Sequence, residues 1–123
     1  MCGLMATLGL SGWAAPEDKA MYGMIGKMTT ATGKREEVIS LLLRAVQAMA
    51  GYLSYVVAQD ATDENGIWIT EVWDSKESHD ASLSLPEVKK SIAAAHPMIA
   101  AFSNQVTTTP IGGFGVPTVK TGR

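Results

Sequence analysis

The sequence predicts an α+β fold of the ferredoxin-like type, in which helices cover one face of an antiparallel sheet. The strongest indication is the order of periodic segments, which read as strand, helix, strand, strand, helices and strand (βαββαβ). The length of 123 residues suits one domain and is too short for two. Hydrophobic residues make up 46% and charged residues 18%, a globular composition with an ample core. We therefore expect an N-terminal extension (1–20), one domain (21–110) and a C-terminal tail (111–123).

The first strand and the first helix are predicted from their apolar periodicity. Residues 21–30 alternate in the manner of a strand, with Met24 and Met28 on one side. Thr32 and Gly33 then open a helix, and acidic residues in its first turn suit the helix dipole. One face of this helix carries an apolar stripe at helical spacing, made of Val38, Leu41, Leu42, Ala45 and Met49.

The second and third strands form a predicted hairpin, because residues 52–59 and 67–73 flank a polar loop that ends in Asn65-Gly66. Tyr52 and Tyr55 should lie on opposite faces of the second strand, so at most one of them faces a pocket. On the third strand, Ile69, Glu71 and Trp73 share one face, and Trp68, Thr70 and Val72 share the other. Helices can cover only one of these apolar faces. We therefore expect a homodimer that covers the other.

Two short helices and a last strand complete the domain. Asp74-x-x-Glu77 and Ser84-x-x-Glu87 have the spacing of capping boxes, with Pro86 in the first turn of the second helix. His96-Pro97 should end that helix. Residues 102–109 read as a fourth strand that stops at Pro110, and the tail beyond it is expected to be a loose arm.

Composition excludes several classes of function. The formal charge is −2 and no basic stripe is present, so nucleic acid is not an expected partner. No apolar run is long enough to span a bilayer. Cys2 is the only cysteine, and His79 and His96 lie far apart, so we expect no disulfide and no metal site built from His and Cys. Binding of a hard cation by carboxylates alone stays open, but no loop has the calcium-loop pattern, and we expect no metal. No Lys or Arg precedes Lys19, which disfavours a signal peptide and favours a cytoplasmic protein.

Residues 69–77 (ITEVWDSKE) carry a resemblance to a known family. A strand ending in Glu-x-Trp, then a polar cap and a Lys-Glu pair, resembles the antibiotic biosynthesis monooxygenase family, including its quinol monooxygenase type. Residues 50–55 (AGYLSY) resemble the glycine-led second strand of that family, and residues 83–86 (LSLP) the segment before its last helix. The resemblance extends over residues 21–113.

The resemblance implies a dimeric α+β barrel, built by two ferredoxin-like subunits that pack their sheets together. It also implies an apolar pocket between sheet and helices. Several members of the family oxidise phenols, anthrones or quinols with O2, using neither metal nor flavin. The implied function is therefore a cofactor-independent monooxygenase acting on a small aromatic, phenolic or quinol substrate, with no cofactor and no membrane or nucleic-acid partner.

The sequence departs from the family at one position. Many members carry a histidine in an Ala-His-Leu pattern soon after the Trp, whereas here Ser82 stands between Ala81 and Leu83. His79, one helical turn earlier, is the candidate base that takes a phenolic proton. Trp73 would pack on the substrate ring, although a tryptophan at this place is also typical of plain core.

Polar handles for the substrate are expected beside Trp73. Glu71 must pair, be solvated or have a raised pKa, because apolar Ile69 and Trp73 flank it on one face. A structural ion pair would satisfy it as well. The other candidates for contact with the substrate are Tyr55, Ile69, Ser82 and Asn104.

Two further functions fit the same fold. A non-catalytic dimer that binds a small molecule would keep the architecture without the chemistry, and Ser82 in the histidine's place favours it. Haem degradation is less favoured, because those relatives carry an asparagine on the first strand and a histidine on the last helix. Here the first strand has no asparagine, and Ile92 holds the helix position.

Overall fold

The computed structural model describes residues 20–119 and has the predicted ferredoxin-like order. The expected N-terminal extension and the question of a signal peptide concern residues 1–19, which lie outside the described residues, as do residues 120–123. The elements in chain order are β1 (Tyr22–Thr30), α2 (Arg35–Ala48), β2 (Tyr52–Gln59), β3 (Gly66–Trp73), α3 (Lys76–Ser82), α4 (Pro86–Ala95), the 3-10 turn η2 (His96–Met98) and β4 (Ile99–Thr108).

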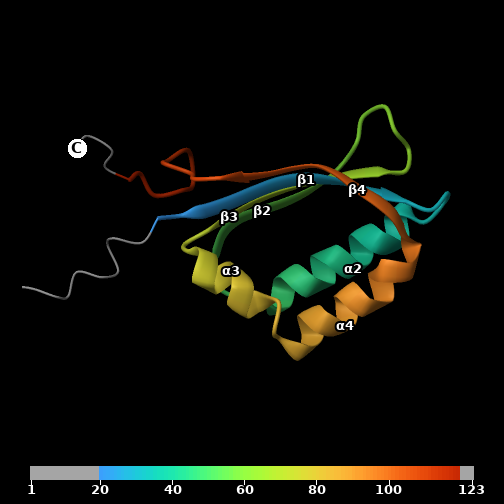
Figure 1. The fold of residues 1–123 in the computed structure, drawn as a ribbon, viewed down its shortest axis with the longest axis horizontal. Coiled ribbons are helices and arrows are strands. Elements are labelled where there is room, and N and C mark those ends of the chain that lie inside the picture. Colours follow the sequence, from blue (N-terminus) through green and yellow to red (C-terminus); the bar gives the residue numbers. More distant parts are fainter. Residues whose placement is uncertain (1–19, 120–123) are drawn as a thin grey trace, which may run out of the picture.

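The four strands form one antiparallel sheet in the order β2-β3-β1-β4. All helices lie on one side of it: α2 and α4 run side by side beneath the sheet, and α3 lies at the end where β3 stops (Figure 1). The opposite face of the sheet carries no helix of the described residues. Strands β2 and β4 are the two edges.

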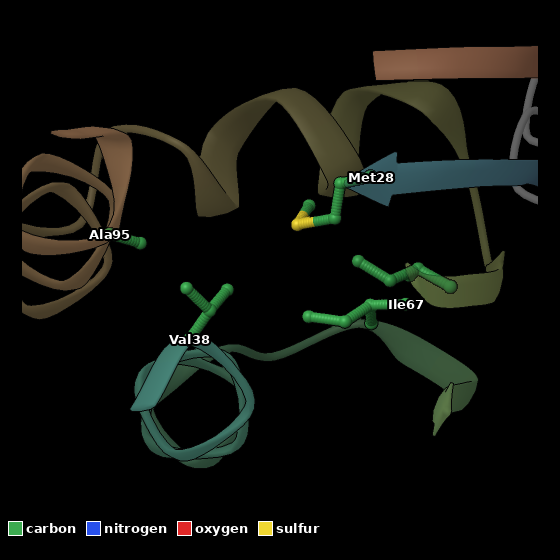
Figure 2. Close-up of a cluster of buried hydrophobic side chains, with 5 residues drawn as sticks. Met28, Val38, Ile67 and Ala95 are labelled. Atoms are coloured by element: carbon green, nitrogen blue, oxygen red, sulfur yellow. The ribbon is translucent and has the colours of Figure 1, made fainter. Parts of the chain in front are cut away.

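The core fills the space between the sheet and the helices at one end of the domain. Figure 2 shows the side chains of Met28 from β1, Val38 from α2, Ile67 from β3 and Ala95 from α4 pointing toward one another. Ile69 belongs to the same cluster. Since Val38 and Ile67 are completely buried, the predicted stripe of α2 and the predicted inward face of β3 meet here.

The helix starts differ from the predicted ones by one to three residues. Ser75, not Asp74, caps α3, and its Oγ accepts a hydrogen bond from the Ser78 backbone N–H at 3.1 Å. The predicted capping box at Ser84 is wrong, because the N-cap of α4 is Leu85, which makes no side-chain cap. Pro86 lies in the first turn of α4, as predicted. Helix α2 begins at Arg35 rather than at Thr32, since a turn closed by the Lys34 N–H on the Ala31 carbonyl precedes it.

The prediction that Tyr52 and Tyr55 face opposite ways is wrong. The pairing of β2 with β3 slips between Tyr52 and Ser54, and such an irregularity interrupts the strict alternation of side chains. The ring centroids of Tyr52 and Tyr55 are therefore only 6.4 Å apart, and the Tyr52 ring lies edge-on to Trp73 at 6.0 Å.

The loop between β2 and β3 is organised by the carboxylate of Asp60. Its Oδ1 accepts hydrogen bonds from the backbone N–H groups of Thr62 and Asp63, each at 2.9 Å. Its Oδ2 accepts one from the indole N–H of Trp68 at 2.7 Å. These donors, led by the Thr62 N–H, hold the pKa of Asp60 well below its usual range.

Two basic side chains fasten the same loop to the rest of the domain. Lys27 Nζ from β1 lies 3.4 Å from Asp60 Oδ2 and 3.0 Å from Asp63 Oδ2. Arg35 Nη1, at the start of α2, donates to the Asp63 carbonyl at 2.9 Å. The loop is thereby tied to a strand and to a helix.

The fourth strand is longer than predicted, and the chain after it folds back on itself. Strand β4 begins at Ile99, because the turn η2 leads directly into it. Beyond β4, the Val119 N–H donates to the Ile111 carbonyl at 2.8 Å and the Val116 N–H to the Gly113 carbonyl at 3.1 Å. Residues 111–119 therefore form a small closed turn rather than the loose arm that the sequence suggested.

We predict that Asp60→Asn lowers the stability of the domain in a pH-dependent way. The folded state lowers the pKa of Asp60, so its charged form contributes stability above its unfolded value of about 3.9. That contribution is lost as the pH falls below about 4, through the lower folded value. The difference in melting temperature between wild type and Asp60→Asn should thus be present at pH 7 and shrink below pH 4.

The control is Glu64→Gln, which removes an exposed charge from the same loop. It should leave the melting temperature nearly unchanged at both pH values. A difference between wild type and Asp60→Asn that is the same at pH 7 and pH 3 would contradict the pKa shift.

Candidate functional site

A cavity of about 290 Å3 lies between the sheet and helices α2, α3 and α4. Its walls are mainly apolar, and α2 contributes the predicted stripe residues Leu41 and Leu42, with Met49 following at the end of the helix. Where bulkier side chains would fill the space, the lining is small: Gly26, Ala45, Ser82, Ser91 and Ala95. The cavity therefore arises because small side chains stand among larger ones on its walls.

Trp73 and Glu71 occupy the inward face of β3 at one end of this cavity. Trp73 is only 1% exposed, and its Nε1–H donates a hydrogen bond to Glu71 Oε1 at 2.8 Å. They are two residues apart on one strand, so their side chains leave the sheet on the same side. The predicted need of Glu71 for a partner is met by this indole, not by a basic side chain.

Tyr55 lies directly across from Glu71 in the pairing of β2 with β3. Burial, and after it the charge of Glu71, raises the pKa of the Tyr55 phenol far above its usual value. The phenol therefore keeps its proton at all physiological pH values. It can donate a hydrogen bond within the cavity, beside an acceptor on Glu71.

His79 reaches the same end of the cavity from α3. Its side chain is 13% exposed, and its ring lies 5.5 Å from that of Trp73 and 5.0 Å from that of Tyr22. His79 is therefore a largely buried residue of α3 rather than an exposed one. Packing against two aromatic rings fixes where the imidazole lies.

The other side of the imidazole is held by Asp80. Its Oδ1 lies 3.0 Å from His79 Nδ1, and its Oδ2 accepts from Lys76 Nζ at 2.7 Å. The hydrogen bond from Lys76, which has the larger effect, and that from His79 lower the pKa of the Asp80 carboxyl. Asp80 is therefore charged at neutral pH. A carboxylate beside Nδ1 favours the tautomer with its proton there, which leaves Nε2 as the basic nitrogen.

Ser82 lines the cavity, but its hydroxyl hydrogen is donated to the backbone and not to the cavity. It is buried, and its Oγ donates to the His79 backbone carbonyl at 2.6 Å. The hydroxyl therefore stabilises the turn of α3 that carries His79, and only its oxygen lone pairs remain for a ligand.

Asn104 does not line the cavity, unlike the other predicted residues. It is exposed on β4 and has a positive φ of 52°, and its neighbour Gln105 lines the cavity in its place. The structure thus brings together the remaining predicted site residues: Tyr55, Ile69, Glu71, Trp73, His79 and Ser82.

The sequence analysis missed Gln105 and Ser91, and it gave His96, which also lines the cavity, only a structural reading at a helix end. Ser91 could have been found, because it follows Val88 by three residues on the buried side of α4. Gln105 could not be found from strand alternation alone.

In residues 20–119, no three His, Cys, Asp or Glu side chains are grouped closely enough to hold a metal ion. Within the same range, no helix has the length and apolar character needed to cross a membrane.

Comparison with known proteins gives a family match and similar structures. The family model described as antibiotic biosynthesis monooxygenase matches residues 21–94. A protein from Chloroflexus aurantiacus J-10-fl, named as a putative antibiotic biosynthesis monooxygenase, is 53% identical and has a TM-score of 0.77. The match covers 80% of this chain and 100% of that one. No match is found among the curated proteins.

More distant solved structures share the fold. A Bacteroides thetaiotaomicron VPI-5482 protein with the same kind of name is 15% identical with a TM-score of 0.68, over 84% of this chain and 97% of that one. A Nitrosomonas europaea protein, also so named, is 14% identical with a TM-score of 0.65, over 76% of this chain and 92% of that one. At these identities the likeness concerns the fold alone.

We predict that Glu71→Leu destabilises the domain by about 1–3 kcal/mol, because it leaves the buried Trp73 indole N–H without an acceptor. Glu71→Gln keeps an acceptor oxygen at the same place and should retain most of the stability. Urea unfolding of the two variants and wild type measures the difference. Equal losses in both variants would show that the charge of Glu71, not the hydrogen bond, is what matters.

Proposed function

The chain belongs to the antibiotic biosynthesis monooxygenase family, and we propose that it oxidises a small aromatic, phenolic or quinol substrate with O2 and without a cofactor. One observation carries the proposal. His79, with its Nδ1 beside a carboxylate, lines the same apolar cavity as Trp73 and Glu71. A base, an aromatic wall and a polar anchor around one small space are what the proposed reaction needs, and the lining of this cavity supports it.

The cavity limits what can bind. Its volume of about 290 Å3 is at the lower end of small-molecule pockets, which span about 300–1,000 Å3. An aromatic ring suits the apolar lining and can pack against Trp73. A hydroxyl on that ring finds an acceptor in Glu71 and a donor in Tyr55.

The chemistry starts with removal of a proton. O2 in its triplet ground state reacts poorly with closed-shell molecules, so the substrate must first become an electron-rich anion. His79 Nε2 takes the phenolic proton, and the charged Asp80 stabilises the imidazolium that forms. The phenolate then transfers one electron to O2, which gives a substrate radical and superoxide.

Recombination of these radicals forms a carbon–oxygen bond at a ring carbon and gives a peroxide. The outer oxygen of this peroxide anion takes the proton back from the imidazolium, which gives a hydroperoxide. The neutral imidazole then removes the hydrogen on the same carbon, the O–O bond breaks, and the departing hydroxide takes up that proton and leaves as water. For a substrate carbon with two hydrogens the sum is CH2 + O2 → C=O + H2O. The protein contributes the base, the orientation and a largely apolar surrounding.

A second candidate is a binding protein of the same fold that turns nothing over. The observation that favours it is Ser82, which stands where many members have a histidine and donates its hydrogen to a backbone carbonyl. Such a hydroxyl supplies neither an acid nor a base. Binding of aromatic ligands without oxygen uptake would be its signature.

We predict oxygen uptake by the metal-stripped protein with 1,4-dihydroxynaphthalene or anthrone, above the rate without protein. His79→Gln should lower kcat by about 10²–10⁴, the usual contribution of a general base. Glu77→Gln, an exposed change on the same helix, should leave the rate unchanged. The measurement is made in an oxygen electrode.

Uptake that begins only after iron or flavin is added would contradict the cofactor-free reaction. Full activity in His79→Gln would show that another group is the base.

We further propose that the functional form is a homodimer in which a second copy covers the open face of the sheet. This face carries Ile25, Val56 and Val106, which are 37%, 51% and 52% exposed, besides Trp68 and Val72. The helices within residues 20–119 lie on the other side. Pairing of two such sheets would bury on the order of 1,500 Å2, the size of a stable interface.

We predict that Val56→Lys weakens the dimer, because it places a charge on the open sheet face. The matched control is Leu43→Lys on α2, since Leu43 is 49% exposed and Val56 51%. Leu43→Lys should remain dimeric at micromolar concentration, whereas Val56→Lys should dissociate or unfold. Light scattering gives the mass, and wild-type protein that is a folded monomer at high concentration would refute the dimer.

A further inference from the structure

Strands β1 and β4 run side by side at one edge of the sheet (Figure 1). A bulge interrupts their pairing between Ile25 and Lys27. Ile25 pairs with Val106 and Lys27 pairs with Ser103, so the single residue Gly26 lies opposite two residues, Asn104 and Gln105. This two-against-one arrangement defines a β-bulge. Asn104 adopts the left-handed φ of 52° that the bulge requires, which asparagine tolerates better than most residues.

The bulge changes which side chain of β4 faces the helices. Ser103 and Val106 stay paired with Lys27 and Ile25, whose side of the sheet is the open one. Gln105 lines the cavity on the other side. In a regular strand Ser103 and Val106, which are three residues apart, would lie on opposite faces of the sheet. The bulge lets both of them face the open side.

Gly26 makes room for the Gln105 side chain. A Cβ atom built on Gly26 would lie 2.5 Å from Gln105 Nε2 and 3.0 Å from its Cδ. The Gln105 amide therefore lies against the bare backbone of β1, on the floor of the cavity. Any side chain at position 26 would displace it.

The amide of Gln105 is available for a ligand. Among residues 20–119 it makes no hydrogen bond that meets the usual distance and angle limits, although it can donate two and accept two. Gln105 and its apolar neighbour Phe102 are both solvent-exposed, so they line the cavity where it opens to solvent, while Ile99 of the same strand is half-buried. A polar group at the opening of an apolar cavity is suited to orient a ligand that enters it.

The position of Gln105 relative to Glu71 defines what the ligand must look like. Glu71 is on β3 and Gln105 on β4, with β1 between them, so the two backbones are about 10 Å apart at a strand spacing of about 4.8 Å. Met24 of β1 pairs with Glu71, and Gly26 pairs with Ile69, so the floor between the two polar groups is apolar.

We infer that Gln105 is a second polar anchor of the substrate, which holds an oxygen on the side of the ring opposite to Glu71 and His79. The site would thus select aromatic substrates with oxygens at both ends of the ring system over those with a single hydroxyl. This inference rests on the proposed function, since it concerns the substrate of the same cavity. Gly26 and Asn104 are positioning residues that set the place of the Gln105 amide.

The test compares binding of 1,4-dihydroxynaphthalene and 1-naphthol, two probes that differ by one hydroxyl. Dissociation constants are measured by calorimetry without oxygen, so that no turnover occurs. Wild type should prefer the dihydroxy probe, and Gln105→Leu should reduce this preference about fivefold, the usual weight of one hydrogen bond. Binding of 1-naphthol itself should change little.

Two further variants separate the anchor from a general loss of structure. Gly26→Ala needs only the flexible end of Gln105 to move, so it should fold and lose the preference as Gln105→Leu does. Asn104→Gly keeps a residue that accepts a positive φ and should retain the preference. Melting temperatures confirm that each variant is folded.

The outcomes distinguish this inference from the proposed reaction. An unchanged preference in Gln105→Leu overturns the anchor, even if wild type consumes oxygen. A preference lost in Gln105→Leu and Gly26→Ala but kept in Asn104→Gly supports the anchor, even if no oxygen is consumed and the oxygenase proposal fails. Failure of wild type to prefer the dihydroxy probe overturns the inference as well.

Discussion

The polar part of the cavity depends on the hydrogen bond from the Trp73 indole to the Glu71 carboxylate. A buried indole N–H needs an acceptor, and a carboxylate among apolar side chains needs a donor, so each fixes the other. Both side chains also act on their neighbours in the cavity. The Trp73 ring packs against His79 and Tyr52, and the Glu71 charge helps to keep Tyr55 protonated.

Helix α3 supplies the reactive half of the same arrangement. Within seven residues it carries His79, the Asp80–Lys76 pair that holds its Nδ1, and Ser82, which fastens its backbone carbonyl. The Ser75 cap fixes where this helix begins and therefore which residues face β3. The imidazole is thus positioned by local contacts of a short helix and by the aromatic wall of the sheet.

Most of the fold followed from periodicity, whereas the choice of Trp73 and His79 as site residues rested on the family resemblance of residues 69–77. Alternation along β3 placed Ile69, Glu71 and Trp73 on one face, and the stripe of α2 placed Leu41 and Leu42 across from it. The errors arose where a strand gains one residue. The irregularity at Tyr52 and the bulge at Asn104 each shift the alternation, so a reading by period two assigns the wrong face from that point on.

A crystal structure of the protein with 1-naphthol bound would test the assignment of this cavity most directly. The ring should lie against Trp73 between the sheet and the helices, with its hydroxyl within hydrogen-bond distance of His79 Nε2 or Glu71. A naphthol bound on the open face of the sheet, with the cavity beneath the helices left to water, would contradict the assignment.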